Sequence, residues 1–159
     1  MEKKILDPCC GSRMFYFDKE DPRVVFGDIR IFEGLCCDGR KIKINPDVST
    51  DFTQLDFPDN SFHLVIFDPP HLIRVGDNAW LKQKYGSLPK KSWKETLKKG
   101  FKECWRVLEP GGTLIFKWNE SQIKLTKIKD LFPDKPVIGT RTNTNTMFIV
   151  FYKTKNSSV

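Results

Sequence analysis

The sequence has 159 residues, 39% of them hydrophobic and 30% charged, which is the composition of a globular protein with one hydrophobic core. It contains neither a signal peptide nor an apolar run of membrane-spanning length, so we expect a cytoplasmic protein that does not enter a membrane. The net charge of +7 favours an acidic partner, and nucleic acid is the first candidate. We expect a single domain over residues 1–153 and a disordered tail over 154–159.

Short apolar runs in the first half of the chain predict parallel strands that alternate with other segments. Residues 5–7 form the first strand and run into a loop that contains Gly11. Residues 24–28 form the second strand, which ends in an acid about twenty residues after that loop. Between residues 31 and 44, the Asp38-Gly39 turn predicts a β-hairpin in place of a crossover helix. A third strand region follows at residues 47–52.

The apolar run at residues 63–67 stops at Asp68-Pro69-Pro70-His71. Two consecutive prolines cannot continue a ladder of hydrogen bonds, so the strand ends there in a stiff corner. In open α/β sheets this edge binds ligands. The Asp68 carboxylate and nearby carbonyls can accept hydrogen bonds from an exocyclic amine, while the His71 ring can stack on a flat base. The plainer alternatives are an acid that caps a turn and a neutral imidazole satisfied within the loop.

Residues 69–91 have weak periodicity and several glycines and prolines, which predicts a long irregular loop of the kind that often forms a lid. Ser92 and Glu95 then predict a capping box that starts a helix, and Pro110-Gly111-Gly112 predicts its end. Apolar side chains recur along it at helical spacing and predict a core stripe, consisting of Trp93, Leu97, Phe101, Cys104 and Leu108.

The rest of the chain predicts a strand at 113–118 and a helix at 121–131. Strands at 137–140 and 147–152 then form a closing antiparallel hairpin. Basic residues between Arg74 and Lys102 alternate with aromatic ones, a pattern typical of contacts with a nucleic-acid strand.

Five cysteines, an odd number, make a disulfide framework improbable in a chain without an export signal. The pairs Cys9-Cys10 and Cys36-Cys37, with His63 or His71, raise the alternative of a zinc site. Adjacent cysteines seldom serve one tetrahedral metal, so we expect no metal.

Several of these segments together resemble the S-adenosylmethionine (SAM) dependent amino-methyltransferases. The corner resembles their Asp-Pro-Pro-Tyr signature, residues 5–12 resemble their first motif, and residues 105–116 resemble their helix, Pro-Gly-Gly turn and fifth strand. More narrowly, the sequence is similar to small orphan methyltransferases of phages and prophages. The resemblance implies a Rossmann-like class I methyltransferase fold of the α/β class. Such a fold has a mainly parallel seven-stranded sheet and a C-terminal antiparallel hairpin.

The resemblance also implies where SAM and its target bind. The loop around the methionine part of SAM corresponds to Asp7, Pro8, Cys9, Cys10, Gly11, Ser12 and Arg13. Asp28 corresponds to the acid that binds the ribose, and Asp51 with Phe52 to the pair at the adenine. Asp68, Pro69, Pro70 and His71 correspond to the catalytic clamp on the target amine. Many relatives have a small residue at the position of Arg13, which here either engages the cofactor carboxylate or marks a rearranged pocket.

We therefore predict a SAM-dependent methyltransferase acting on an exocyclic amine of a nucleic-acid base, first adenine N6 in DNA. An RNA base methyltransferase acting on guanine N2 or adenine N6 is the nearest alternative. Protein-glutamine methylation is disfavoured because Asn usually opens that motif. A degenerate binding module without SAM is favoured by Arg13 but disfavoured by the complete series of acids. The chain begins almost at its first strand, so we expect target recognition to need a homodimer, a partner protein or a single-stranded substrate.

Overall fold

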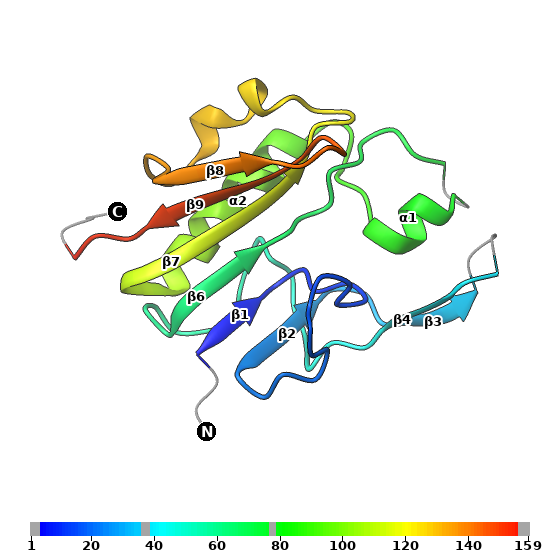
Figure 1. The fold of residues 1–159 in the computed structure, drawn as a ribbon, viewed down its shortest axis with the longest axis horizontal. Coiled ribbons are helices and arrows are strands. Elements are labelled where there is room, and N and C mark those ends of the chain that lie inside the picture. Colours follow the sequence, from blue (N-terminus) through cyan, green and yellow to red (C-terminus); the bar gives the residue numbers. More distant parts are fainter. Residues whose placement is uncertain (1–3, 36–38, 77–78, 156–159) are drawn as a thin grey trace.

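The computed structural model describes residues 4–35, 39–76 and 79–155, and its main feature is a seven-stranded sheet (Figure 1). In spatial order the strands are β5 (Val48–Ser49), β2 (Val24–Asp28), β1 (Ile5–Asp7), β6 (Phe62–Phe67), β7 (Leu108–Asn119), β9 (Thr146–Tyr152) and β8 (Ile138–Arg141). The five strands from β5 to β7 are mutually parallel, and β9 is antiparallel to both of its neighbours. The predicted Rossmann-like α/β fold, with a mainly parallel seven-stranded sheet and a C-terminal antiparallel hairpin, is confirmed.

The strand order reverses direction at β1, which lies between β2 and β6. The chain builds outward from β1 to β2 and β5, then returns to the other side of β1 with β6 and β7. Ile5 of β1 is in register with Val24 on one side and with Leu64 on the other. The carboxyl ends of β1, β2 and β6 therefore meet at the switch point where such sheets bind ligands.

Helix α2 (Trp93–Val107) covers one face of the sheet, behind β6 and β7 in Figure 1. The rings of Phe67, Phe101 and Phe116 pack with centroids 4.8–5.8 Å apart. A Cβ at Gly100 would lie 2.7 Å from the Phe67 ring, so the glycine permits this close approach. The predicted core stripe is confirmed at its buried members Leu97, Phe101, Cys104 and Leu108, with Trp93 partly buried against the same core.

The predicted start of this helix at Ser92 is confirmed, but its predicted end and its capping box were wrong. Helix α2 ends at Val107, because Leu108 takes extended backbone (ψ 131°) and joins β7 opposite Phe62. The segment with Pro110 and the two glycines thus lies inside β7. At the start, the N-cap Ser92 makes no side-chain capping hydrogen bond, since its backbone (φ −125°, ψ 17°) is not the extended conformation of a capping residue.

Two further segments differ from prediction. The region predicted as an irregular loop contains the short helix α1 (Trp80–Tyr85), which ends at Gly86 with φ +70°. A six-residue helix is too short to show a period in sequence. The predicted helix over 121–131 is instead a pair of 3-10 turns, η1 (Leu125–Lys127) and η2 (Lys129–Leu131). There the Glu120 carboxylate accepts the Leu125 backbone N–H at 2.7 Å and holds the chain in turns.

The predicted hairpin is confirmed as β3 (Phe32–Leu35) paired with β4 (Lys41–Ile44) in a separate two-stranded sheet. Its predicted turn residue Asp38 lies outside the described residues, as do Cys36, Cys37 and most of the tail. The predicted closing hairpin is confirmed as β8 and β9. Within the described part of the chain, no helix has the length and apolar character needed to cross a membrane.

Candidate active site

A cavity of about 430 Å3 opens at the carboxyl ends of the parallel strands, and we call it the strand-end cavity. Its walls come from the loop after β1, the end of β2, the segment after β5, the corner after β6 and the start of α2. The residues that line it include Cys9, Asp28, Asp51, Phe52 and Asp68. Its volume is within the range of small-molecule sites, about 300–1,000 Å3.

Asp68 occupies the predicted corner at the end of β6, in the wall of the strand-end cavity. Its carboxylate accepts a hydrogen bond from the Lys117 ammonium at 2.6 Å, and the two side chains are 22% and 23% exposed. Burial raises the pKa of Asp68, whereas the Lys117 charge and hydrogen bond lower that pKa. Lys117 therefore favours the ionised carboxylate in a poorly solvated place.

A second, much smaller cavity of about 50 Å3 lies on the other side of the corner, and we call it the corner cavity. Its walls include Asp68, His71, Lys117 and, from the loop after β1, Met14 and Phe15. Asp68 is thus common to both cavities.

The His71 ring lies 5.5 Å from the Tyr85 ring and 6.5 Å from Trp118, measured between centroids. Burial, with a smaller effect of the Lys117 charge, lowers the pKa of His71 to about 4. His71 is therefore a neutral imidazole at neutral pH, available for ring contacts in the wall of the corner cavity.

The predicted cofactor residues in the loop after β1 do not all line the same cavity. Pro8 and Cys9 line the strand-end cavity, while Gly11 and Ser12 line the corner cavity together with Cys9 and Cys10. Burial raises the pKa of Cys10 to about 12, so this thiol is protonated and unreactive at neutral pH.

Asp7 is fully buried beneath this loop. Its carboxylate accepts hydrogen bonds from the Tyr16 hydroxyl at 2.8 Å and from the Cys9 backbone N–H at 3.0 Å. Burial raises the pKa of Asp7 to about 7, against the opposing effect of these hydrogen bonds. The structure shows Asp7 as a support for the loop, and the described contacts do not bring it to the cavity wall.

Asp28 lines the strand-end cavity, but four hydrogen bonds already reach its carboxylate. One comes from the Gly11 backbone N–H at 2.9 Å, and three come from Arg30, through its backbone N–H, Nε and Nη2 at 2.9–3.0 Å. Arg30 also donates to the Gln83 carbonyl of α1 at 3.3 Å. Since a carboxylate has about four lone-pair sites, a ribose hydroxyl can bind Asp28 only where an Arg30 donor leaves.

Asp51 and Phe52 lie side by side in the same wall, as predicted for an adenine site. One Asp51 oxygen accepts the backbone N–H and the hydroxyl of Thr53, each at 2.8 Å. The Phe52 ring packs edge-on against Phe67, with centroids 5.5 Å apart, and a Cβ at Gly100 would lie 2.6 Å from it. The core thus fixes the Phe52 ring at the cavity wall.

Arg13 contacts other parts of the chain and does not line the strand-end cavity. Its guanidinium lies 3.9 Å above the Phe26 ring and donates to the carbonyls of Lys19 and Asn45 and to Asp47. The side chain is only 8% exposed and also pairs with Glu20 at 3.1 Å. Through these contacts Arg13 joins the first loop to the segment after β4, away from the strand-end cavity.

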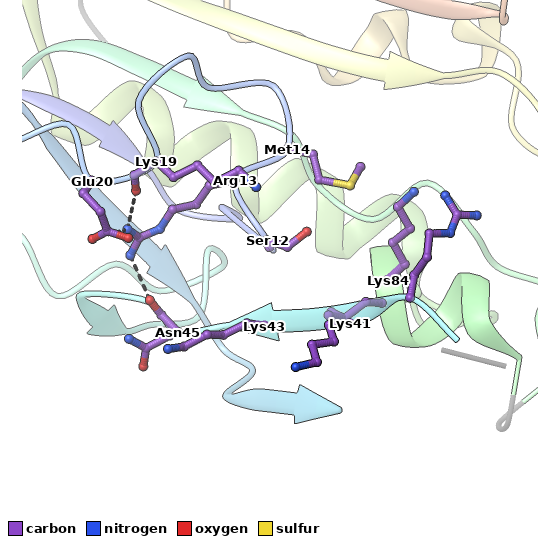
Figure 2. Close-up of a pocket in the computed structure, with 12 residues that line it drawn as sticks. Ser12, Arg13, Met14, Lys19, Glu20, Lys41, Lys43, Asn45 and Lys84 are labelled. Atoms are coloured by element: carbon purple, nitrogen blue, oxygen red, sulfur yellow. Dashed lines mark hydrogen bonds and ion pairs between the residues drawn. The ribbon is translucent and has the colours of Figure 1, made fainter. Parts of the chain in front are cut away.

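A third cavity, about 460 Å3, lies between the first loop and β4, and we call it the basic groove. Figure 2 shows Ser12 and Met14 on one side, Lys41 and Lys43 of β4 on the opposite side, and Lys84 of α1 at one end. The groove shares Gly11, Ser12, Met14 and Lys84 with the corner cavity. The three cavities therefore form a continuous series of neighbouring sites.

Sequence reasoning missed several of these residues. Lys117 had a signal, since it interrupts the apolar strand residues on either side of it. Lys41 and Lys43 also had a signal in the sequence, because they alternate with isoleucines that are buried in β4. Of the basic residues predicted between 74 and 102, Lys84 lines the groove and Lys99 lines the strand-end cavity. Three others surround a separate depression at the start of α2, namely Lys91, Lys94 and Lys98.

No protein-family model matches the sequence, and no curated protein matches it. Among solved structures, the chain resembles the crystal structure of the PH0226 protein from Pyrococcus horikoshii OT3 with a TM-score of 0.58. The two sequences are 17% identical, and the alignment covers 98% of this chain and 83% of the other. At this identity the likeness shows the fold alone, and it agrees with the sheet order described above.

Proposed function

We propose that the protein is a SAM-dependent methyltransferase that acts on an exocyclic amine of a nucleic-acid base, with adenine N6 in DNA as the first substrate. The observation that carries this proposal is the position of Asp68, whose side chain lines both the strand-end cavity and the corner cavity. A methyl donor in the first cavity and an amine in the second would meet at this carboxylate. The methyltransferase-type sheet order supports the same reading.

The strand-end cavity has suitable walls for SAM. The bound cofactor supplies a methyl group activated by a sulfonium, and its positive charges suit a wall that contains Asp51 and Asp68. Phe52 offers an apolar face for the adenine, and the free lone pairs of Asp51 can accept its amine. Asp28 binds a ribose hydroxyl only after Arg30 withdraws at least one hydrogen bond.

Asp68 has the central chemical role in this proposal. Its carboxylate accepts a hydrogen bond from the target amine, which turns the nitrogen lone pair toward the incoming methyl group. A bound methyl donor would supply the methyl group and leave as S-adenosylhomocysteine, and the Asp68 carboxylate would be placed to accept the proton that the nitrogen releases. Lys117 favours the ionised carboxylate, since its charge lowers the pKa of Asp68 against the larger effect of burial, which raises that pKa.

The corner cavity must enlarge to receive a base, because about 50 Å3 holds only one or two water molecules. Met14 and Phe15 are 51% and 38% exposed, so they can move without disrupting the core. The neutral His71 ring and the Tyr85 ring lie in this wall, and each offers a face on which a base can stack once the cavity has enlarged. Extrusion of the base costs a few kcal/mol from a duplex and less from a single strand.

The test combines cofactor binding with methyl transfer. SAM and S-adenosylhomocysteine are titrated by calorimetry into wild type and Asp28→Ala, and labelled methyl transfer to DNA and RNA is measured. We expect SAM to bind wild type, to bind Asp28→Ala more weakly, and to methylate adenine in DNA. Methylation of RNA alone would move the assignment to an RNA base. Absence of SAM binding would overturn the enzyme proposal and favour a binding module.

A further inference from the structure

We propose that the basic groove binds the phosphodiester backbone of a single-stranded nucleic acid beside the target base. This inference rests on the proposed function, since it places the chain that carries the base in the corner cavity. Of the basic residues between 74 and 102 that predicted nucleic-acid contacts, Lys84 lines this groove, but most of the groove comes from the first loop and β4.

The charge of the groove is the first argument. Its walls carry five cations besides Arg13, namely Lys19, Arg40, Lys41, Lys43 and Lys84. The acid in its wall is Glu20, which pairs with Arg13 at 3.1 Å. A site with this excess of positive charge attracts a polyanion, and the binding energy comes largely from release of counterions.

The geometry of β4 is the second argument. Lys41 and Lys43 are both exposed, whereas Ile42 and Ile44 between and after them are buried. Alternate residues of a strand lie on one face about 7 Å apart, so the two ammonium groups form a short row along the groove. Pairing with β3 holds this row in place (Figure 2). Glu33 lies opposite Lys43 in the hairpin but does not line the groove.

The continuity of the groove with the corner cavity is the third argument. Ser12, Met14 and Lys84 line both, so a nucleotide whose base enters the corner cavity has its phosphates at the mouth of the groove. This connection is a property expected of a substrate path, and a basic patch elsewhere on the surface would lack it.

The size and chemistry of the groove favour one strand over a duplex. A cavity of about 460 Å3 encloses a short stretch of a single backbone, and its cations bind phosphates without reading base edges. We therefore infer sequence-tolerant binding, in which the groove positions the strand and the corner cavity selects the base.

The experiment compares two matched double variants. Lys41→Thr with Lys43→Thr removes the row on β4, and threonine suits a strand. Lys127→Thr with Lys129→Thr removes two exposed charges from the 3-10 turns, which lie at the other end of the sheet (Figure 1). Binding of a short fluorescein-labelled single-stranded DNA, the matching RNA and the duplex is measured by anisotropy between about 50 and 200 mM salt.

We expect the groove variant to bind the single-stranded DNA about tenfold more weakly, with a salt slope smaller by about two, and the control variant to bind like wild type. An equal loss in both variants, or none in the groove variant, would overturn the inference. Tighter wild-type binding of the duplex would overturn its single-strand part. RNA bound as tightly as DNA, with the same loss, supports a backbone site shared by both.

The proposed function is tested separately on the same proteins by SAM titration. If SAM binds and methyl transfer occurs while the groove variant binds DNA normally, the groove inference fails and the function stands. If the groove variant loses DNA binding but SAM does not bind wild type, the function fails and the groove remains a nucleic-acid site.

Discussion

The strand-end cavity and the basic groove have opposite charge, although only the small corner cavity separates them. The first has four acids in its walls, Asp28, Asp51, Asp68 and Glu95, whereas the second has an excess of cations. SAM carries positive charge and nucleic acid carries negative charge, so under the proposed function each ligand has a cavity of complementary charge. The difference in charge is thus an observation, and the assignment of the two ligands, with Asp68 between them, is the part of the proposal that experiments must test.

The largest effect is expected when the charge of Asp68, which lines both the strand-end cavity and the corner cavity, is removed. In Asp68→Asn the side chain keeps its size but no longer accepts strongly from the amine or takes up its proton. We expect the rate of methyl transfer to fall by about 10²–10³, as for loss of a group that stabilises a transition state. Single-turnover assays at saturating SAM measure this.

The exposed Asp56→Asn is the matched control and should react like wild type. Methyl transfer by Asp68→Asn at the wild-type rate would contradict the proposal that the methyl donor and the target amine meet at Asp68.

The next effect concerns stability on the acidic side. The folded pKa of Asp7, about 7, exceeds its usual 3.8, so the folded state holds a proton that the unfolded chain has lost. In this respect stability is greatest below about pH 4, falls as pH rises to about 7 and then levels off, with a total loss on the order of 4 kcal/mol. Urea unfolding of Asp7→Asn should lack this component of the pH dependence, whereas wild type should retain it.

The effect of Lys117 on the charge of Asp68 can be tested through the pH dependence of the reaction. Transfer requires ionised Asp68, so the rate is lost as pH falls through the pKa of this carboxylate. Lys117→Met removes a charge that lowers this pKa, so the acid limb of the pH–rate profile should move to higher pH. Lys117→Arg should restore the limb toward its wild-type position. An unmoved limb in the methionine variant would show that Lys117 does not position the charge on Asp68.

The smallest expected effect is at Arg30, which with Lys99 is one of two cations in a wall that also contains four acids. Arg30→Met frees the Asp28 carboxylate and removes a positive charge facing the cationic cofactor, so SAM should bind about threefold to tenfold more tightly. S-adenosylhomocysteine, which lacks the sulfonium charge, should gain less. Weaker SAM binding in this variant would mean that Arg30 supports the cavity through its contact with Gln83.

Sequence reasoning identified the half of the site that depends on the sheet. Parallel strands that end in Asp28 and Asp68 must bring these acids to one edge, so their neighbourhood followed from strand order alone. It could not show that Arg30 occupies the lone pairs of Asp28, because two residues of separation do not fix a side-chain direction. The role of Asp7 was also hidden, since its burial depends on Tyr16 in a loop without regular structure.

The basic groove could not be predicted from the sequence, for a different reason. Its cations come from residues 19, 40–43 and 84, which become neighbours only through the fold of the first loop over the hairpin. The short helix α1 that carries Lys84 had no periodic signal. Local patterns therefore predicted the elements, but only the packing between distant elements revealed the second binding side.

The most direct test of this division maps both ligands on one labelled protein. At 18.5 kDa the chain suits amide chemical-shift mapping by NMR. SAM should shift the amides near Asp28 and Asp51–Phe52, single-stranded DNA should shift those of residues 40–43, and the two sets should overlap only around Cys9 and Asp68, which line both the strand-end cavity and the corner cavity. Shifts of the same residues by both ligands, or no shifts with SAM, would contradict the account.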